Sequence, residues 1–151
     1  MIRMVDILGK KATGKILTRE EISFFVSGMC AGEIPDYQAS ALLMAIYLNG
    51  MTPEETADLT NLMAHSGNMI DLSAIDGIKV DKHSTGGIGD KTTLVVGPMV
   101  AACGGKVAKM SGRALGACGG TVDKLESVPG YEIGFPEKKF VESVNRLGIS
   151  V

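Results

Sequence analysis

A glycine-rich segment from Val80 to Thr93 holds the first residues whose types and spacing suggest chemistry. Lys82 supplies a positive charge, and Ser84 and Thr93 supply hydroxyl donors. The glycines between them carry no Cβ atom, so the backbone can approach a ligand closely. Because an apolar helix is predicted to follow, backbone N–H groups and the positive end of that helix would point at an anion. Phosphate is the anion that this set of donors suits best.

A second glycine-rich segment, from Lys109 to Thr121, repeats the same donors after the next predicted strand. Lys109 and Ser111 stand at its start, and we expect Thr121 to cap the helix that follows. Loops at the carboxyl ends of neighbouring parallel strands face one crevice, where open α/β sheets usually bind ligands. One such turn is more often a simple connection than a binding site. Two of them with matching donors favour a phosphate site.

The spacing within the first segment excludes two common nucleotide-binding motifs. A Walker A loop needs an unbroken Gly-Lys-Ser/Thr, whereas Asp90 stands between Gly89 and Lys91 in this chain. The dinucleotide-binding fingerprint needs a third glycine at the position of Thr92. A phosphate site of a different kind is therefore expected.

An alternation of short strands and helices is predicted to position both segments, and it is typical of a parallel-sheet α/β domain. We expect a last helix to begin at Pro136 and a last strand to follow Leu147. The predicted strands are 78–81 and 106–110, and the helices between and after them are 94–102 and 121–128. We assign residues 78–151 to the start of this domain. The chain ends as its last strand begins, so we expect the domain to be incomplete here.

Residues 1–67 are predicted to form a small all-helical domain, joined to the α/β domain by a linker at 68–77. Its helices are predicted to begin at Thr18, Pro35 and Thr52, because Thr18 and Thr52 each open a capping box and Pro-Asp suits a helix start. The helix after Pro35 is so rich in apolar residues, from Ala41 to Leu48, that we expect it to be buried on more than one side.

Composition limits the partners and the compartment of the chain. The 15 Lys and Arg nearly balance the 17 Asp and Glu, and only 5% of the residues are aromatic, which argues against nucleic acid as a partner. No apolar run is long enough to cross a membrane, and no signal peptide is recognisable. Cys30, Cys103 and Cys118 are widely spaced, so neither a disulfide framework nor a zinc site is predicted, and a reducing cytoplasm fits best.

Taken together, these motifs resemble the thymidine and pyrimidine-nucleoside phosphorylases. The resemblance covers essentially the whole chain. It rests on Lys-His-Ser-Thr-Gly-Gly at 82–87, Gly-Asp-Lys-Thr-Thr at 89–93, Lys-Met-Ser-Gly-Arg at 109–113, Gly-Gly-Thr-Val-Asp-Lys-Leu-Glu-Ser at 119–127, Gly-Glu-Ile-Pro-Asp-Tyr-Gln at 32–38 and Met-Thr-Pro-Glu-Glu-Thr at 51–56.

The resemblance implies homodimers of subunits about three times this length, paired through the small helical domain, with the active site between that domain and a large α/β domain. His83 would contact the pyrimidine carbonyl, and in some members backbone oxygens matching Gly89 and Lys91 bind potassium. No other cofactor is implied. The implied phosphate ligands are Lys82, Ser84, Thr93, Lys109, Ser111 and Thr121.

The implied reaction is the phosphorolysis of thymidine, uridine or deoxyuridine to free base and (deoxy)ribose 1-phosphate. Inorganic phosphate, the co-substrate, attacks the anomeric carbon as the glycosidic bond breaks, and His83 stabilises the negative charge on the leaving base. The Arg, Ser and Lys with which such enzymes grip the base lie beyond Val151. This chain alone is therefore expected to be inactive.

The second segment departs from the family pattern at Ala114, Ala117 and Cys118, where the family usually has Gly, His and Thr. The missing histidine at Ala117 removes a polar group close to the expected phosphate. Two alternatives stay open. One is a related phosphoribosyltransferase, such as the anthranilate enzyme, which binds pyrophosphate with magnesium. The other is a non-catalytic module that acts in dimerisation or interaction.

Overall fold

A computed structural model describes residues 2–83, 87–115 and 118–151 of the chain. It divides into two compact units, residues 1–69 and residues 70–151. The first unit is helical and the second combines helices with a parallel sheet. The predicted fold class, a helical N-terminal part followed by a parallel-sheet α/β region, is confirmed. Among the described residues, no helix has both the length and the apolar character that crossing a membrane would require.

The helical unit contains α1 (Met4–Ala12), α2 (Arg19–Cys30), α3 (Asp36–Asn49) and α4 (Pro53–Ala64). The capping boxes are present as predicted. The Thr18 hydroxyl accepts from Glu21 N–H, and the Thr52 hydroxyl accepts from Glu55 N–H. The glutamates return the contact, because each carboxylate accepts from the backbone N–H of its own threonine. Local sequence therefore fixes where α2 and α4 begin.

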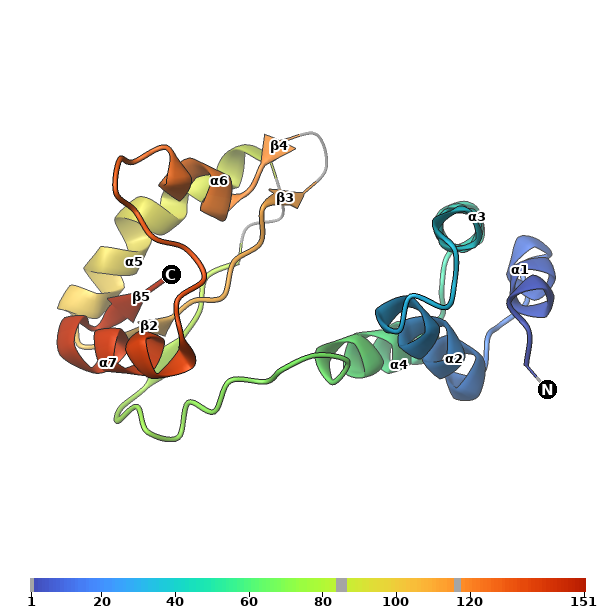
Figure 1. The fold of residues 1–151 in the computed structure, drawn as a ribbon, viewed down its shortest axis with the longest axis horizontal. Helices are drawn as coiled ribbons and strands as arrows, with labels where there is room; N and C mark the ends of the chain where they lie inside the picture. The colour runs from blue at the N-terminus through green and yellow to red at the C-terminus, as the bar shows by residue number, and fades with distance from the viewer. Residues whose placement is uncertain (1, 84–86, 116–117) are drawn as a thin grey trace. The chain divides into compact units, whose positions relative to one another are not determined.

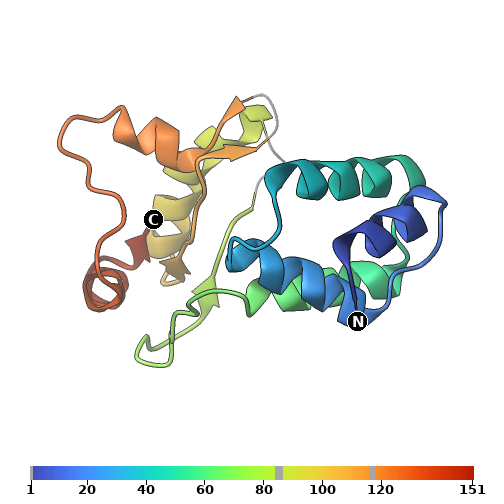
Figure 2. The ribbon, with the colours of Figure 1, turned by 45° about the vertical axis from the view of Figure 1, so that its right-hand side comes forward.

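The core of this unit forms where α1 packs against α3 and α2 packs against α4 (Figure 2). Ile7 of α1 is fully buried, and Leu42 of α3 is 1% exposed. The other buried members of the core are Met4, Leu17, Ile22, Val26 and Ile34. A buried ion pair, in which the Lys11 ammonium lies 2.7 Å from the Glu55 carboxylate, joins α1 to α4 inside this core.

The prediction that α3 is buried on more than one side is wrong for this structure. Leu42 and Ala45 are buried, but Met44 is 56% exposed and Leu48 is 72% exposed. Tyr47, one residue before Leu48, is 82% exposed. The apolar residues of α3 therefore form a buried face and an exposed face. Composition alone could not separate the two, because both faces are apolar.

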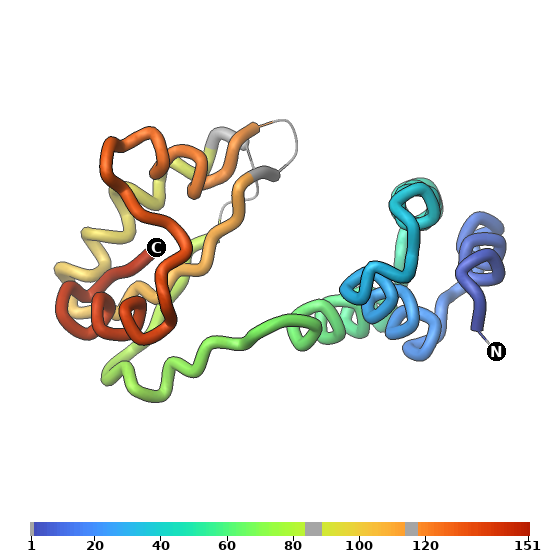
Figure 3. The backbone as a smooth tube through the Cα atoms, in the orientation of Figure 1, coloured from blue at the N-terminus to red at the C-terminus, as the bar shows by residue number. Residues whose placement is uncertain are grey.

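The α/β unit is built on three short parallel strands, ordered β1 (Lys79–Val80), β2 (Lys106–Ala108) and β5 (Ile149–Ser150). Strands β2 and β5 are labelled in Figure 1. Helix α5 (Thr92–Ala102) lies between β1 and β2 in the sequence, and helix α7 (Glu137–Leu147) directly precedes β5. In register, Val80 lies beside Val107, and Val107 lies beside Ile149. Before β1, the backbone from 65 to 78 contains no helix or strand (Figure 3).

Side chains alternate between the two faces of this sheet, and each face meets a different helix. On the Ala108 face, Phe140 and Val144 of α7 form a buried cluster with Ile75. On the opposite face, α5 comes so close at Gly97 that a Cβ atom there would lie 2.8 Å from Ile149 Cδ1. Glycine at this position therefore allows the contact between α5 and the sheet.

Several features of the α/β unit were not predicted from the sequence. A 3₁₀ turn, η1 (Gly87–Lys91), precedes α5, and a small antiparallel pair, β3 (Ala114–Leu115) and β4 (Cys118–Gly119), precedes α6 (Thr121–Glu126). The expectation that Thr121 caps α6 is wrong. Gly120 is the N-cap, and the Asp123 carboxylate accepts from Gly120 N–H at 2.8 Å, so Thr121 is the first helical residue.

Candidate functional site

The first glycine-rich segment is organised around the Lys82 ammonium, just after β1. This group donates to the Thr93 hydroxyl and to the Gly89 carbonyl oxygen, both at 3.2 Å. The Thr92 hydroxyl donates to the same carbonyl at 2.6 Å. Thr93 is only 2% exposed and lies in the first turn of α5, where the helix end favours negative charge. Lys82 and Thr93 are thus held together beside an end of a helix that suits an anion.

Lys109 joins the carboxyl end of β2 to the carboxyl end of β1. Its side chain is 7% exposed, and its ammonium donates to the Lys82 carbonyl oxygen at 2.7 Å. Its carboxylate partner, Asp81, is 3.4 Å away and has a half-exposed side chain. The positive charge of Lys109 is therefore buried but only weakly neutralised within the described part of the chain.

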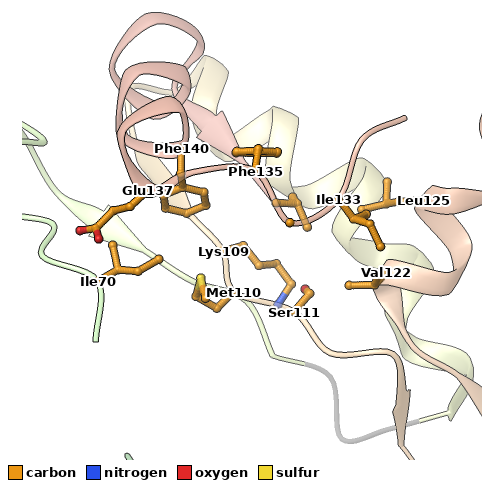
Figure 4. A pocket seen from close by; sticks show the side chains of 12 residues that line it. Ile70, Lys109, Met110, Ser111, Val122, Leu125, Ile133, Phe135, Glu137 and Phe140 are labelled. Carbon is orange, nitrogen blue, oxygen red and sulfur yellow. The ribbon is translucent and has the colours of Figure 1, made fainter. Parts of the chain in front are cut away.

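Ser111 lies two residues beyond Lys109, and both residues line a cavity of about 210 Å³ (Figure 4). The other side of this cavity is apolar and includes Val122, Leu125 and Phe140. The Ser111 hydroxyl oxygen is buried and has no hydrogen-bond partner among the described residues. Leaving such a group unpaired costs roughly 1–3 kcal/mol, so this position suits a ligand that accepts or donates a hydrogen bond.

Thr121 is 6% exposed and is the first residue of helix α6. The Lys124 ammonium of α6 lies 3.6 Å from the Asp90 carboxylate of η1. On another side of α6, the Arg113 guanidinium contacts Glu126 and Asp123. The hydrogen bonds from Arg113 lower the pKa of Glu126, and Glu126 and Asp123 raise the pKa of Arg113. Helix α6 is therefore tied to both glycine-rich segments.

The structure supports the other predicted site residues less directly. His83 is exposed, and no described hydrogen bond joins it to Lys82 or Thr93. Ser84 lies outside the described residues, as does Ala117. The Gly89 carbonyl oxygen expected to bind potassium already accepts two hydrogen bonds, from Lys82 and Thr92. The potassium site, including Lys91, stays a prediction.

Three charged residues that help to build the site were not among the predicted site residues. Asp81 pairs with Lys109, and Asp90 pairs with Lys124. Both aspartates lie within the first glycine-rich segment, and Lys124 follows the second. Their position beside the predicted ligands could have indicated that they belong to the site. Which of them form charge pairs could not be predicted, because that depends on which loops meet in space.

Two family models match the chain and together cover most of it. Residues 5–67 match the helical bundle domain of a glycosyl transferase family, and residues 76–151 match the a/b domain of the glycosyl transferase family. The two matched ranges lie within the helical unit and the α/β unit, respectively.

Curated relatives carry one recurring name. The chain is 60% identical over 150 residues to a pyrimidine-nucleoside phosphorylase of Geobacillus stearothermophilus and 59% identical to one of Bacillus subtilis (strain 168). In both cases the match covers 99% of this chain but 35% of the relative, so the chain spans about a third of their length. These similarities confirm the resemblance that the motifs predict.

A solved structure of the same fold is anthranilate phosphoribosyltransferase from Thermus thermophilus. The TM-score is 0.71 at 27% sequence identity, and the match covers 95% of this chain and 44% of that one. The chain is thus similar both to pyrimidine-nucleoside phosphorylases and to a phosphoribosyltransferase, which means that the fold alone does not decide the reaction.

Proposed function

Because this chain belongs to the glycosyl transferase family described by these helical-bundle and α/β domain models, we propose that it supplies the phosphate-binding part of a pyrimidine-nucleoside phosphorylase. The whole enzyme would convert thymidine, uridine or deoxyuridine and inorganic phosphate to free base and (deoxy)ribose 1-phosphate. The names of the relatives that are 57–60% identical support this reaction class.

The observation that carries the proposal is the buried hydroxyl of Ser111, which has no hydrogen-bond partner among the described residues and lies beside the buried ammonium of Lys109 (Figure 4). A phosphate oxygen placed between them would accept a hydrogen bond from Ser111 and neutralise the charge of Lys109. Lys82 and Thr93 lie at the neighbouring strand end, linked to Lys109 by the Lys82 carbonyl oxygen. These four residues form one group of donors suited to a tetrahedral anion.

In the proposed reaction, a phosphate oxygen forms a bond to C1′ of the sugar while the bond from C1′ to the pyrimidine nitrogen breaks. The electron pair of the broken bond leaves with the base, where His83 donates a hydrogen bond to a pyrimidine carbonyl. The contribution of this chain is to hold phosphate in the attacking position, which is worth several orders of magnitude in rate. Residues beyond Val151 would grip the base, so we propose that this chain alone releases no base.

Calorimetric titration of inorganic phosphate into the chain and its Ser111→Ala variant tests the proposal. We expect a roughly 10- to 100-fold loss of affinity in the variant, because a charge-assisted hydrogen bond is worth about 1.5–3 kcal/mol. Thermal stability without phosphate should stay unchanged or rise, because an unpaired buried hydroxyl has been removed. The exposed Ser27, in the helical unit, provides the control variant Ser27→Ala, which should bind phosphate normally. Equal affinity in the unchanged chain and in Ser111→Ala would contradict the proposal.

We further propose that the whole protein forms a homodimer through the helical unit and functions in the cytoplasm. The exposed apolar side chains of α3, with Met44, Tyr47 and Leu48, support a partner on this unit. Cys30, Cys103 and Cys118 are unpaired and exposed, which suits a reducing compartment. Sedimentation of the chain with and without Tyr47→Glu tests the dimer.

A phosphoribosyltransferase remains a second candidate because of the shared fold with the Thermus thermophilus enzyme. Such an enzyme binds a pyrophosphate group with magnesium. Titration with phosphoribosyl pyrophosphate and Mg²⁺ separates the two candidates. We expect inorganic phosphate to bind more tightly than this mixture, and the opposite order would favour the second candidate.

A further inference from the structure

A bridge between Asp90 and Lys124 connects the two glycine-rich segments. The Lys124 ammonium lies 3.6 Å from the Asp90 carboxylate and donates to the Gly119 carbonyl oxygen at 2.6 Å. The Asp90 side chain is 11% exposed and that of Lys124 is 34% exposed, so solvent screens this pair less than a surface pair. Helix α6 and strand β4 both contact η1, which places the bridge at a point of direct packing.

The two residues of the Asp90–Lys124 bridge are connected to different proposed phosphate ligands. Asp90 directly follows Gly89, whose carbonyl oxygen orients the Lys82 ammonium toward Thr93. Lys124 lies on α6, which begins at Thr121 and is anchored to the second segment through Arg113. A shift of η1 relative to α6 would therefore change the spacing between the two groups of donors.

We infer that Lys124 is a positioning residue for phosphate, which acts through Asp90 to set the distance between Lys82 and Thr93 on one side and Thr121 on the other. This inference rests on the proposed function. The reaction is sensitive to spacing, since a displacement of about 1 Å can cost on the order of 100-fold in rate. Binding is sensitive too, because a hydrogen bond weakens as its donor moves away from the phosphate oxygen. Lys124 does not need to touch the anion to affect its affinity.

A double-mutant cycle in the 151-residue chain tests the inference, with phosphate affinity measured by calorimetry for Lys124→Met, Asp90→Asn and the double variant. We expect Lys124→Met to weaken binding at least about 10-fold, and the double variant to bind no more weakly than Asp90→Asn. Lys124→Arg should restore most of the affinity, because arginine keeps the charge. Lys138→Met, an exposed lysine of α7, is the matched control and should bind normally.

Amide hydrogen exchange without phosphate reports on the bridge itself. In Lys124→Met we expect faster exchange in η1 and at the start of α6, with helices α1 to α4 unchanged. Unchanged exchange in η1, or unchanged phosphate affinity, would overturn the inference and leave the proposed function standing. Independent losses from Lys124→Met and Asp90→Asn would also overturn it, because they would mean that Lys124 contacts phosphate directly. If the unchanged chain binds no phosphate, the proposed function fails, and the positioning role fails with it even where exchange shows an intact bridge.

Discussion

The two units of this chain use their buried polar groups differently. In the helical unit, buried Lys11 and Glu55 satisfy each other, and Glu55 also accepts from the backbone N–H groups of Leu17 and Thr52. In the α/β unit, the buried donors gather where β1 and β2 end, and the Ser111 hydroxyl has no partner among the described residues. Buried charge that is fully paired holds a fold together, whereas buried donors left over indicate where a ligand binds.

The largest effect that would sharpen this comparison is expected from Lys11→Met. The change leaves the carboxylate of Glu55, whose side chain is 1% exposed, without its cationic partner. Breaking a buried pair from one side costs about 3–5 kcal/mol, and we expect a loss of that size in the free energy of unfolding of the helical unit. Urea unfolding followed by circular dichroism measures it.

Two further variants decide whether this cost comes from the unpaired carboxylate. Lys15→Met removes an exposed lysine of the same unit and should change the free energy of unfolding by less than about 0.5 kcal/mol. The double variant Lys11→Met, Glu55→Gln removes both charges and should recover part of the loss. A double variant as unstable as Lys11→Met would contradict the role assigned to the pair.

The second prediction makes the same substitution in the α/β unit. Lys109→Met removes a lysine that is also buried, with a side chain 7% exposed against 3% for Lys11. Its partners, however, are the Lys82 carbonyl oxygen and the half-exposed Asp81, which water can solvate. We expect a loss of stability of about 1–3 kcal/mol and a loss of phosphate affinity of at least about 10-fold, measured by calorimetry. Lys106→Met, at the other end of β2, should keep its phosphate affinity. Normal phosphate binding by Lys109→Met would break the comparison, because Lys109 would then be a structural charge like Lys11.

The sequence predicted local features of this molecule better than the contacts between its parts. The starts of α2 and α4 followed from Thr18 and Thr52, because a capping box involves residues only three positions apart. The strands β1, β2 and β5 and the helices α5 to α7 followed from the alternation of apolar runs and glycine-rich turns. The exposed side of α3 could not be predicted, since apolar content does not reveal which face has a neighbour.

The candidate site shows the same limit. Lys82, Thr93, Lys109 and Ser111 were named from residue type and motif, and the structure places them at two adjacent strand ends. The link from Lys109 to Asp81 and the link from Lys124 to Asp90 span 28 and 34 positions of sequence. Pairs this far apart depend on the strand order and on the packing of α6 against η1, which no local pattern encodes.

The smallest effect that we predict is a difference between the units in acid. Burial alone would raise the pKa of Glu55, but hydrogen bonds from Leu17 N–H, Lys11 and Thr52 N–H outweigh it and lower the pKa below the ordinary value of 4.5. The unfolded chain therefore binds more protons in this range, so the stabilisation is present above pH 4.5 and is lost as the pH falls through the lowered pKa of Glu55. In the α/β unit the carboxyl groups with lowered pKa, such as Glu126 and Glu132, are exposed, and solvent screening weakens their contribution to stability.

Urea unfolding between pH 3 and 7, followed through the amide NMR signals of each unit, should show the steeper loss of stability below about pH 4.5 in the helical unit. Glu55→Gln, which cannot titrate, should flatten that profile, and an equally steep profile in this variant would show that other carboxyl groups cause the acid sensitivity.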